Sequence, residues 1–398
     1  MSLTQTLAAS RSAGVGLCSS HFCVGGVMVG LTGDDSAAVE LVPSLMAFRA
    51  EPGLPDIQVR VEWTDELTPA SGLQLFDSGA LWRLYECEAG FQFDFRAPVF
   101  GDEPYKRLLV NRDFSRATLQ MNAEVSGAFP YAAPLDYPVD ELLIMHRLTQ
   151  EEAIELHGCG IVRADGTGNL FVGHSGAGKS TTTRLWMERE HVEILSDDRI
   201  IVRRDEGPRD CGSSFEDCGG TSGCEGEVGI LRLRDCSASR DSRFAQDDRT
   251  KTKCFARGGE LEKQVPPLRF ANGRNDKVFM RNDKPSTRNY NASIRNDKSN
   301  MRMYGTPWHG EAAYGSPGSA RLGRIFVLEH GAANVLTRLS ASQAVAELFA
   351  RSFVPFHRHE YVESALEFLQ ELVSAVPCYR YGFEPDGGAV ERILELCD

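Results

Sequence analysis

The sequence predicts an α/β fold for the C-terminal part of the chain, preceded by a mostly β domain. Three observations lead to this prediction. Residues 22–150 show the alternation of apolar and polar residues that is typical of strands. Residues 151–398 combine strand and helix patterns, which is typical of a sheet covered by helices. A glycine-rich motif at 173–180 joins a short apolar strand to a helix.

Size and charge limit the classes of partner. The 398 residues are 42% hydrophobic, an ordinary value for a globular protein, and carry a formal net charge of −13. This charge argues against general binding to nucleic acid or anionic membranes, which need a basic footprint. No stretch is apolar enough to span a bilayer. We therefore predict a cytoplasmic protein with no nucleic-acid and no membrane partner, and a disordered N-terminal extension over residues 1–21.

Residues 22–150 predict a mostly β N-terminal domain. A first strand is expected near 22–31. Four further segments, separated by Gly, Pro and Asp, alternate as strands do: 57–63, 81–85, 91–95 and 117–121. Nothing among them has the spacing of a catalytic set, so we interpret their aromatic residues as core.

Composition indicates an insertion over residues 205–300. Six of the eight lysines fall between 251 and 298, and Arg-Asn-Asp-Lys occurs three times, starting at Arg274, Arg281 and Arg295. Repeats with few large apolar residues do not build a core. We interpret this segment as a low-complexity, largely disordered insertion; the alternative is a basic arm that binds nucleic acid or an acidic partner.

The predicted C-terminal domain covers residues 151–398 around that insertion. The segment 165–168 is expected to be a hairpin turn that pairs strand 170–172 antiparallel with strand 161–163. The other expected elements are helices at 137–156, 181–190, 341–353, 360–376 and 388–396, and strands at 324–328 and 378–383.

The glycine-rich motif predicts a phosphate-binding loop. It matches G-x-x-x-x-G-K-[ST], in which backbone N–H groups surround phosphates, the lysine reaches the outer phosphates and the hydroxyl binds magnesium. The alternative is a glycine-rich turn without a ligand. The expected ATP-binding residues are Gly173, His174, Ser175, Gly176, Ala177, Gly178, Lys179, Ser180 and Thr181.

An acidic pair follows the loop after a short interval. Asp197 and Asp198 end the apolar run 192–195, and carboxylates beside a phosphate loop suit magnesium and phosphoryl chemistry. Their spacing from the loop, with Leu156-His157-Gly158 before it, resembles the HPr kinase/phosphorylase family of serine kinases. The ATP-dependent phosphoenolpyruvate carboxykinases belong to the same structural superfamily. The resemblance implies a P-loop kinase core of the phosphoenolpyruvate carboxykinase-like type with a mixed sheet.

The resemblance also implies roles for individual residues. Asp197 would be the base at the acceptor hydroxyl, and Asp198 with Ser180 would hold magnesium, although the two aspartates could exchange roles. Lys179 would neutralise the phosphates. His157 would move a proton near the transferred phosphate, or be a hydrogen-bonded core residue. Two adjacent carboxylates repel, so one is expected to have a raised pKa.

The segment 305–311 leaves two interpretations open. Trp308, His309 and Glu311 either line the acceptor pocket or assist with metal, or they belong to a Gly/Pro-rich loop packed on the core. This segment matches no motif of the HPr kinases, which leaves the acceptor undefined. A protein, a peptide or a small molecule could supply the hydroxyl. The family resemblance implies a homo-oligomer.

Three functions are compatible with these motifs. The first is an ATP-dependent kinase that acts on a serine or other hydroxyl, with magnesium. The second is a non-catalytic ATP-binding sensor or assembly protein. A carboxykinase-like enzyme is the weakest, because a dicarboxylate needs several cationic groups, and Lys106 and Lys179 are the only lysines outside the insertion.

Overall fold

The structure is a computed structural model that describes residues 17–79, 81–101, 103–124, 133–189, 191–205, 300–310, 312–386 and 388–396. All of these residues belong to one compact unit. The predicted insertion therefore lies outside the described residues, apart from its two ends. The domain boundaries at 21/22 and 150/151 stay predictions, although the first strand already begins at Cys18.

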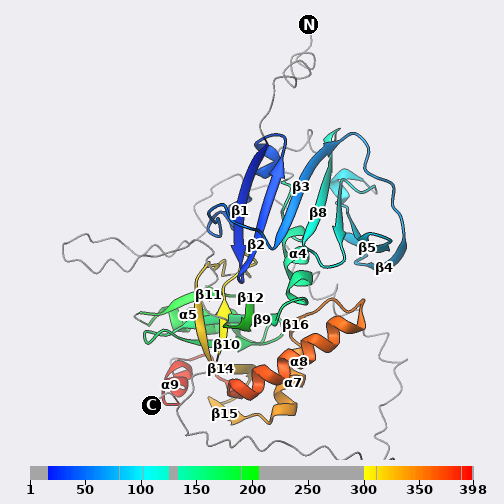
Figure 1. Ribbon diagram of the computed structural model, residues 1–398. Coiled ribbons are helices and arrows are strands. Elements are labelled where there is room, and N and C mark those ends of the chain that lie inside the picture. The colour runs from blue at the N-terminus through cyan, green and yellow to red at the C-terminus, as the bar shows by residue number, and fades with distance from the viewer. Residues whose placement is uncertain are drawn as a thin grey trace, which may run out of the picture. The chain divides into compact units, whose positions relative to one another are not determined.

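The first sheet contains eight strands, whose order is β1-β2-β3-β8-β7-β6-β5-β4 (Figure 1). The strands β2–β3 and β3–β8 pair parallel, and the other neighbours pair antiparallel. Their bounds are β1 (Cys18–Val24), β2 (Val27–Gly33), β3 (Ile57–Thr64), β4 (Leu73–Asp77), β5 (Trp82–Cys87), β6 (Gly90–Phe95), β7 (Lys106–Asn111) and β8 (Arg116–Asn122). Three short helical segments lie among them: η1 (Ala37–Val39), α2 (Pro43–Met46) and η2 (Pro98–Phe100).

The sequence predicted most of this sheet. The four alternating segments at 57–63, 81–85, 91–95 and 117–121 are strands β3, β5, β6 and β8, as expected. The single strand expected near 22–31 is instead a hairpin, because Gly25 and Gly26 both have positive φ and turn β1 back into β2.

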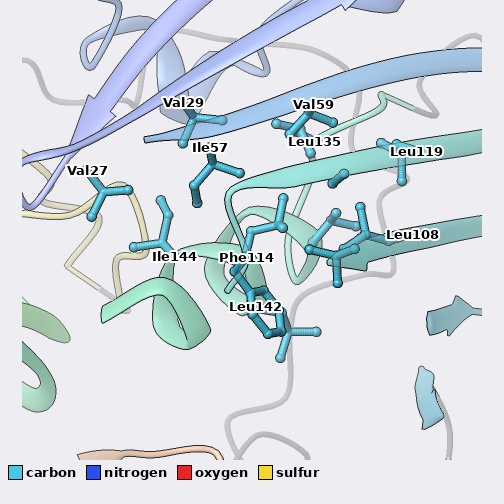
Figure 2. Close-up of a cluster of buried hydrophobic side chains, with 14 of the residues drawn as sticks. Val27, Val29, Ile57, Val59, Leu108, Phe114, Leu119, Leu135, Leu142 and Ile144 are labelled. Atoms are coloured by element: carbon cyan, nitrogen blue, oxygen red, sulfur yellow. The ribbon is translucent and has the colours of Figure 1, made fainter. Parts of the chain in front are cut away.

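Helix α4 (Val139–Leu148) packs on the first sheet. Figure 2 shows its side chains, among them Leu142 and Ile144, against apolar side chains of β2, β3, β7 and β8. Nearly every residue of α4 is buried, including the acidic residues of its first turn, Asp140 and Glu141. Burial of carboxylates is costly unless charged or hydrogen-bonding groups meet them, so the start of α4 requires polar partners.

The second sheet contains nine strands, and five of them close into a barrel. Strand β10 pairs with both β9 and β14, so β10, β9, β12, β13 and β14 form a closed ring. The bounds are β9 (Ala153–Val162), β10 (Thr167–Val172), β11 (Glu193–Ser196), β12 (Arg199–Arg204), β13 (Met301–Tyr304), β14 (Ser319–His330), β15 (Val335–Arg338), β16 (Ser352–Phe353) and β17 (Cys378–Phe383).

Four helices cover this sheet. Figure 1 shows α7 (Ala341–Phe349) beside α8 (His359–Ala375), and both share a hydrophobic cluster with barrel strands. Helices α5 (Lys179–Met187) and α9 (Gly388–Leu394) share another cluster with Phe171 and Phe326. Helix α7 begins with a capping box, in which Ser340 and Gln343 each bond the backbone N–H of the other. No helix among the described residues is long and apolar enough to cross a membrane.

The prediction of an α/β class, with a P-loop kinase core of the phosphoenolpyruvate carboxykinase-like type, is wrong. The described residues are mostly β, in two sheets with a five-stranded barrel, and they include only six α-helices. One physical reason lies at β9. Residues 137–156 were expected to form one helix, but α4 ends at Leu148 and β9 begins at Ala153. Residues 153–156, which the prediction placed in a helix, pair with strand β12 instead.

The hairpin at 165–168 is confirmed. Strands β9 and β10 pair antiparallel, with Val172 opposite Gly158, and Arg163 N donates to Thr167 O. The ends of the predicted insertion also meet in a regular ladder, because β12 pairs antiparallel with β13 and places Arg204 opposite Met301.

Candidate functional site

The glycine-rich loop connects β10 directly to α5. Val172 ends the strand and Lys179 begins the helix. Gly176 has a φ of 81°, and its missing side chain leaves open space. Gly178 has a φ of 104°, and a Cβ there would lie 2.3 Å from Cε1 of Phe383. The backbone path of the loop therefore depends on glycine at both positions.

Lys179 folds back across this loop. Its Nζ donates to the carbonyl oxygens of Gly173 (3.1 Å) and His174 (3.3 Å), and its side chain is buried. Ser180 and Thr181 follow in the first turn of α5 and are half-buried, while Ser175 is exposed. An ammonium group, a helix N-terminus and exposed loop backbone thus lie together, which is the arrangement that phosphate groups require.

Strand β9 connects the loop to the acidic pair. His157 O accepts from Gly173 N (3.2 Å), and on the other edge of the strand His157 lies opposite Arg199. Glu155, His157 and Cys159 alternate along β9 and therefore share one face. The Sγ of Cys159 is 3.8 Å from Lys179 O, so this row of side chains runs from α5 toward β12.

Asp198 lies in a cationic environment. His157 Nε2 donates to Asp198 Oδ1 (3.0 Å), and Arg199 Nε lies 3.5 Å from Oδ2. Burial alone would raise the pKa of Asp198, but the His157 hydrogen bond and the charge of Arg199 hold it well below its usual range. Burial lowers the pKa of His157, against the opposing effect of Asp198. The pair is a permanent carboxylate held by a hydrogen-bonded imidazole.

Asp197 lies in the opposite environment. Its side chain is buried, and its two oxygens accept from the backbone N–H groups of Gly310 (2.9 Å) and Ala312 (2.8 Å). Burial raises the pKa of Asp197, although these two hydrogen bonds partly offset the effect. A raised pKa at one aspartate was expected from repulsion between neighbours; it occurs at Asp197, and burial is its larger cause.

The described part of the segment 305–311, residues 305–310, contacts both helix α4 on the first sheet and the acidic pair. Trp308 is buried in the hydrophobic cluster of the first sheet, and its Nε1 donates to Asp140 Oδ2 (2.9 Å). His309 is half-buried, its Nδ1 lies 3.2 Å from Gly310 O, and its charge lowers the pKa of Asp197. Glu311 lies outside the described residues. Trp308 thus packs on the core, while His309 lies near Asp197.

Several residues at the site were missed in the sequence. Arg199 pairs with Asp198, and Arg351 O accepts from His157 N (2.7 Å). His330, at the end of β14, donates from Nε2 to Gly176 O (2.8 Å). Arg199 directly follows the acidic pair, so its position was a usable signal. The other two come close only through long-range pairing of β14 and β16, which no local pattern indicates.

The residues present fit a magnesium–nucleotide complex. Among the residues that the structure describes, no group of three His, Cys, Asp or Glu side chains could hold a metal ion. Magnesium bound to a nucleotide needs fewer protein ligands, because phosphate oxygens and water complete its octahedral shell. The hydroxyl of Ser180 and the ionised carboxylate of Asp198 are the oxygen donors that suit it.

No protein-family model matches the chain, and no curated protein matches it.

Proposed function

We propose that the chain is an ATP-dependent kinase that transfers the γ-phosphoryl group to a serine or another hydroxyl. The observation that carries this proposal is the difference between the two aspartates beside the phosphate loop. Asp197 has a raised pKa and Asp198 a lowered one. Two carboxyl groups whose environments separate their pKa values suit different tasks, one proton transfer and the other charge stabilisation. The resemblance to HPr kinase/phosphorylase motivates the same assignment.

Each residue would have a separate task. The loop N–H groups and Lys179 would bind and orient the phosphates, which is the main requirement of phosphoryl transfer. Asp197 would accept the proton of the acceptor hydroxyl. Asp198 and Ser180 would hold magnesium, which when bound neutralises phosphate charge. His157 would orient Asp198 through its Nε2 hydrogen bond.

One observation favours a second candidate. Both oxygens of Asp197 already accept backbone N–H groups from the loop at 310–312, as an aspartate with a purely structural task would do. A carboxylate oxygen has two lone pairs, so each oxygen of Asp197 keeps the capacity to accept one further hydrogen bond. The alternative is nonetheless specific: a protein that binds ATP as a sensor and transfers nothing.

The test is magnesium-dependent transfer from ATP labelled at the γ-phosphate, with and without a cell extract. Wild type is compared with Lys179→Ala, Asp197→Ala and Asp197→Asn. We expect Lys179→Ala to weaken ATP binding on the order of 100-fold, because it removes charge-assisted bonds to phosphate. Both Asp197 variants should keep binding while transfer falls by about 10²- to 10⁴-fold, the usual contribution of a general base.

Asp165 provides the control, because its carboxylate lies in the β9–β10 turn and not in the acidic pair. Its side chain is half-exposed and pairs with Arg163 at 3.1 Å. Asp165→Ala should therefore keep both binding and transfer. Labelled protein or small molecule that appears only with wild type and this control supports the kinase. ATP binding by wild type without any transfer supports the sensor.

A further inference from the structure

Two adjacent acidic residues outside the second sheet reach the candidate site. Asp140 and Glu141 lie in the first turn of α4, which packs on the first sheet, and they are 2% and 7% exposed. Neither has a place in the proposed transfer. Burial of two neighbouring carboxyl groups is costly unless each has a partner, and each has a different one.

Asp140 contacts the segment that holds Asp197. Its Oδ1 accepts from Glu141 N (2.8 Å), and its Oδ2 accepts from Trp308 Nε1 (2.9 Å). Gly310, whose N–H donates to Asp197, lies only two residues beyond Trp308. The indole is buried in the hydrophobic cluster of the first sheet. The Asp140–Trp308 bond thus fixes one end of the short segment that reaches Asp197.

Glu141 contacts the cation that faces Asp198. Its Oε1 lies 3.1 Å from Arg199 Nε, the same nitrogen that lies 3.5 Å from Asp198 Oδ2. The guanidinium lies over the ring of Phe353, with its carbon 3.7 Å from the ring centre. Glu155 Oε1 lies 3.7 Å from Nη1 of the same guanidinium. The cation therefore has little freedom, and Glu141 is its nearest acidic partner.

We infer that Asp140 and Glu141 are positioning residues for the candidate site, Asp140 acting on Asp197 through Trp308 and Glu141 acting on Asp198 through Arg199. This inference rests on the proposed function for its catalytic consequence, but the contacts themselves can be tested without nucleotide. Helix α4 then couples the first sheet to both aspartates at once. A mere stabilising role would instead lower the stability of the whole protein without a local effect at the site.

The first experiment tests the contacts that run from Asp140 through Trp308 to Asp197, which we call the Asp140 arm. It measures hydrogen exchange of the Gly310 and Ala312 amides in the full chain. Trp308→Phe removes the indole donor and keeps an aromatic ring. We expect these two amides to exchange about tenfold faster, while amides of β3 and β8 keep their rates. Trp63→Phe is the matched control, because Trp63 packs on the same cluster and its Nε1 has no hydrogen-bond partner.

Asp140→Asn provides a second route if Trp308→Phe does not fold. It keeps the shape of the side chain and weakens the bond to the indole, so exchange at Gly310 and Ala312 should rise by a smaller factor. Unchanged exchange at both amides in the folded variant, or an equal rise in Trp63→Phe, would overturn the Asp140 arm. No nucleotide is present, so this result is independent of the proposed kinase activity.

The second experiment tests the contacts that run from Glu141 through Arg199 to Asp198, which we call the Glu141 arm. It compares two carboxyl groups of similar burial. Glu141 and Glu151 both have side chains 9% exposed, and each pairs with a buried arginine of β12, Arg199 or Arg203. Arg203 donates to Gly25 O, and Glu151 also pairs with Arg147 at 3.2 Å. Glu141→Gln and Glu151→Gln therefore remove the same charge at equal burial, but only one lies beside the site.

The measured quantity is the slow magnesium-dependent hydrolysis of ATP, in which water is the acceptor. We expect Glu141→Gln to lower kcat about tenfold with KM for ATP unchanged, because misplacement of an acting group mainly affects the transition state. Glu141→Asp should recover part of that loss, and Glu151→Gln should keep kcat. Equal losses in Glu141→Gln and Glu151→Gln would overturn the Glu141 arm. Absence of hydrolysis in wild type would count against the proposed function and would remove the catalytic consequence of the Glu141 arm; hydrogen exchange at Gly310 and Ala312 would still decide the Asp140 arm.

Discussion

The two sheets treat their buried charges differently. In the first sheet, Arg107 forms two parallel bonds of 2.6 Å to Asp94, and Lys106 donates to Asp136 and to two backbone carbonyls. In the second sheet, Arg199 alone faces three carboxyl groups, at 3.1, 3.5 and 3.7 Å.

The Arg107–Asp94 pair and the groups around Arg199 show the same contrast in hydrogen bonding, although other atoms of the first sheet, among them Trp63 Nε1 and Gln92 Oε1, also lack a partner. Nε and Nη1 of Arg199 and both carboxyl oxygens of Glu155 are buried without an aligned hydrogen bond. Buried polar groups are normally satisfied, and exceptions concentrate at functional sites. The charges of the first sheet therefore belong to a framework, while those around Arg199 form an arrangement that its neighbours must hold in place.

Neutralising a carboxylate of the first sheet should have the largest effect. Asp94→Asn leaves the buried Arg107 without its anion, which we expect to cost about 3 to 5 kcal/mol of unfolding free energy. Urea unfolding at pH 7 measures this loss. A cost below about 1 kcal/mol would mean that the Arg107–Asp94 pair is no stronger than a surface pair, and the contrast between the two sheets would fail.

A pH experiment tests a buried titratable group on the side of the first sheet, His146 of helix α4. His146 stacks on Phe114, with ring centres 4.6 Å apart, and burial lowers its pKa to about 3. The unfolded chain takes up this proton near pH 6.5, while the folded protein does so only near pH 3, so stability falls as the pH drops between these values. From pH 7 to pH 5 this imidazole should cost on the order of 2 kcal/mol.

Removal of the imidazole should abolish that component. His146→Phe is compared with wild type by urea unfolding at both pH values, and its loss between pH 7 and pH 5 should be smaller by about the same 2 kcal/mol. His191→Asn is the control, since His191 is exposed and has a φ of 59°, which asparagine tolerates. An identical pH dependence in His146→Phe and wild type would show that His146 is accessible to protons in the folded state.

The smallest effect is expected at Glu155. Burial raises the pKa of Glu155 well above the usual range, and the charge of the nearby Glu141 adds to this, so folding favours the neutral form of this carboxyl group. Glu155→Gln mimics that neutral form with a group of similar shape. Unfolding free energy at pH 7 should change by less than about 1 kcal/mol or increase. A loss as large as that of Asp94→Asn would show that Glu155 is ionised and that both sheets bury charge in the same way.

Local patterns in the sequence predicted the parts of the site that are close in the chain. The glycine spacing located the loop, and the short apolar run located Asp197 and Asp198, because both depend on a strand that ends beside a turn. Alternation also predicted strands such as β3 and β6, whose apolar faces are buried. The ATP, magnesium and hydroxyl-acceptor assignments stay predictions, as does the cytoplasmic location.

Long-range pairing determined what the sequence did not show. The α/β class was wrong because nothing local indicates that β10 pairs with β14 across the segment 206–299 and closes a barrel. Glu141 and Arg199 are far apart in the chain, so their contact follows from packing of α4 and not from either neighbourhood. The helix expected at 137–156 also concealed β9, since the apolar residues Ala153, Ile154 and Leu156 suit either element.

The ladder at the base of the segment 206–299 has a consequence for how this chain can vary. Arg204 pairs with Met301, Asp205 N donates to Asn300 O, and Arg302 pairs with Asp205. The strands are joined as a hairpin is, so a few residues would suffice to connect them. Because loop-closure entropy grows only with the logarithm of length, each doubling costs about 0.6 kcal/mol. A whole segment can therefore be lengthened, shortened or exchanged at this junction, in evolution or by protein engineering, while strands β12 and β13 keep their register.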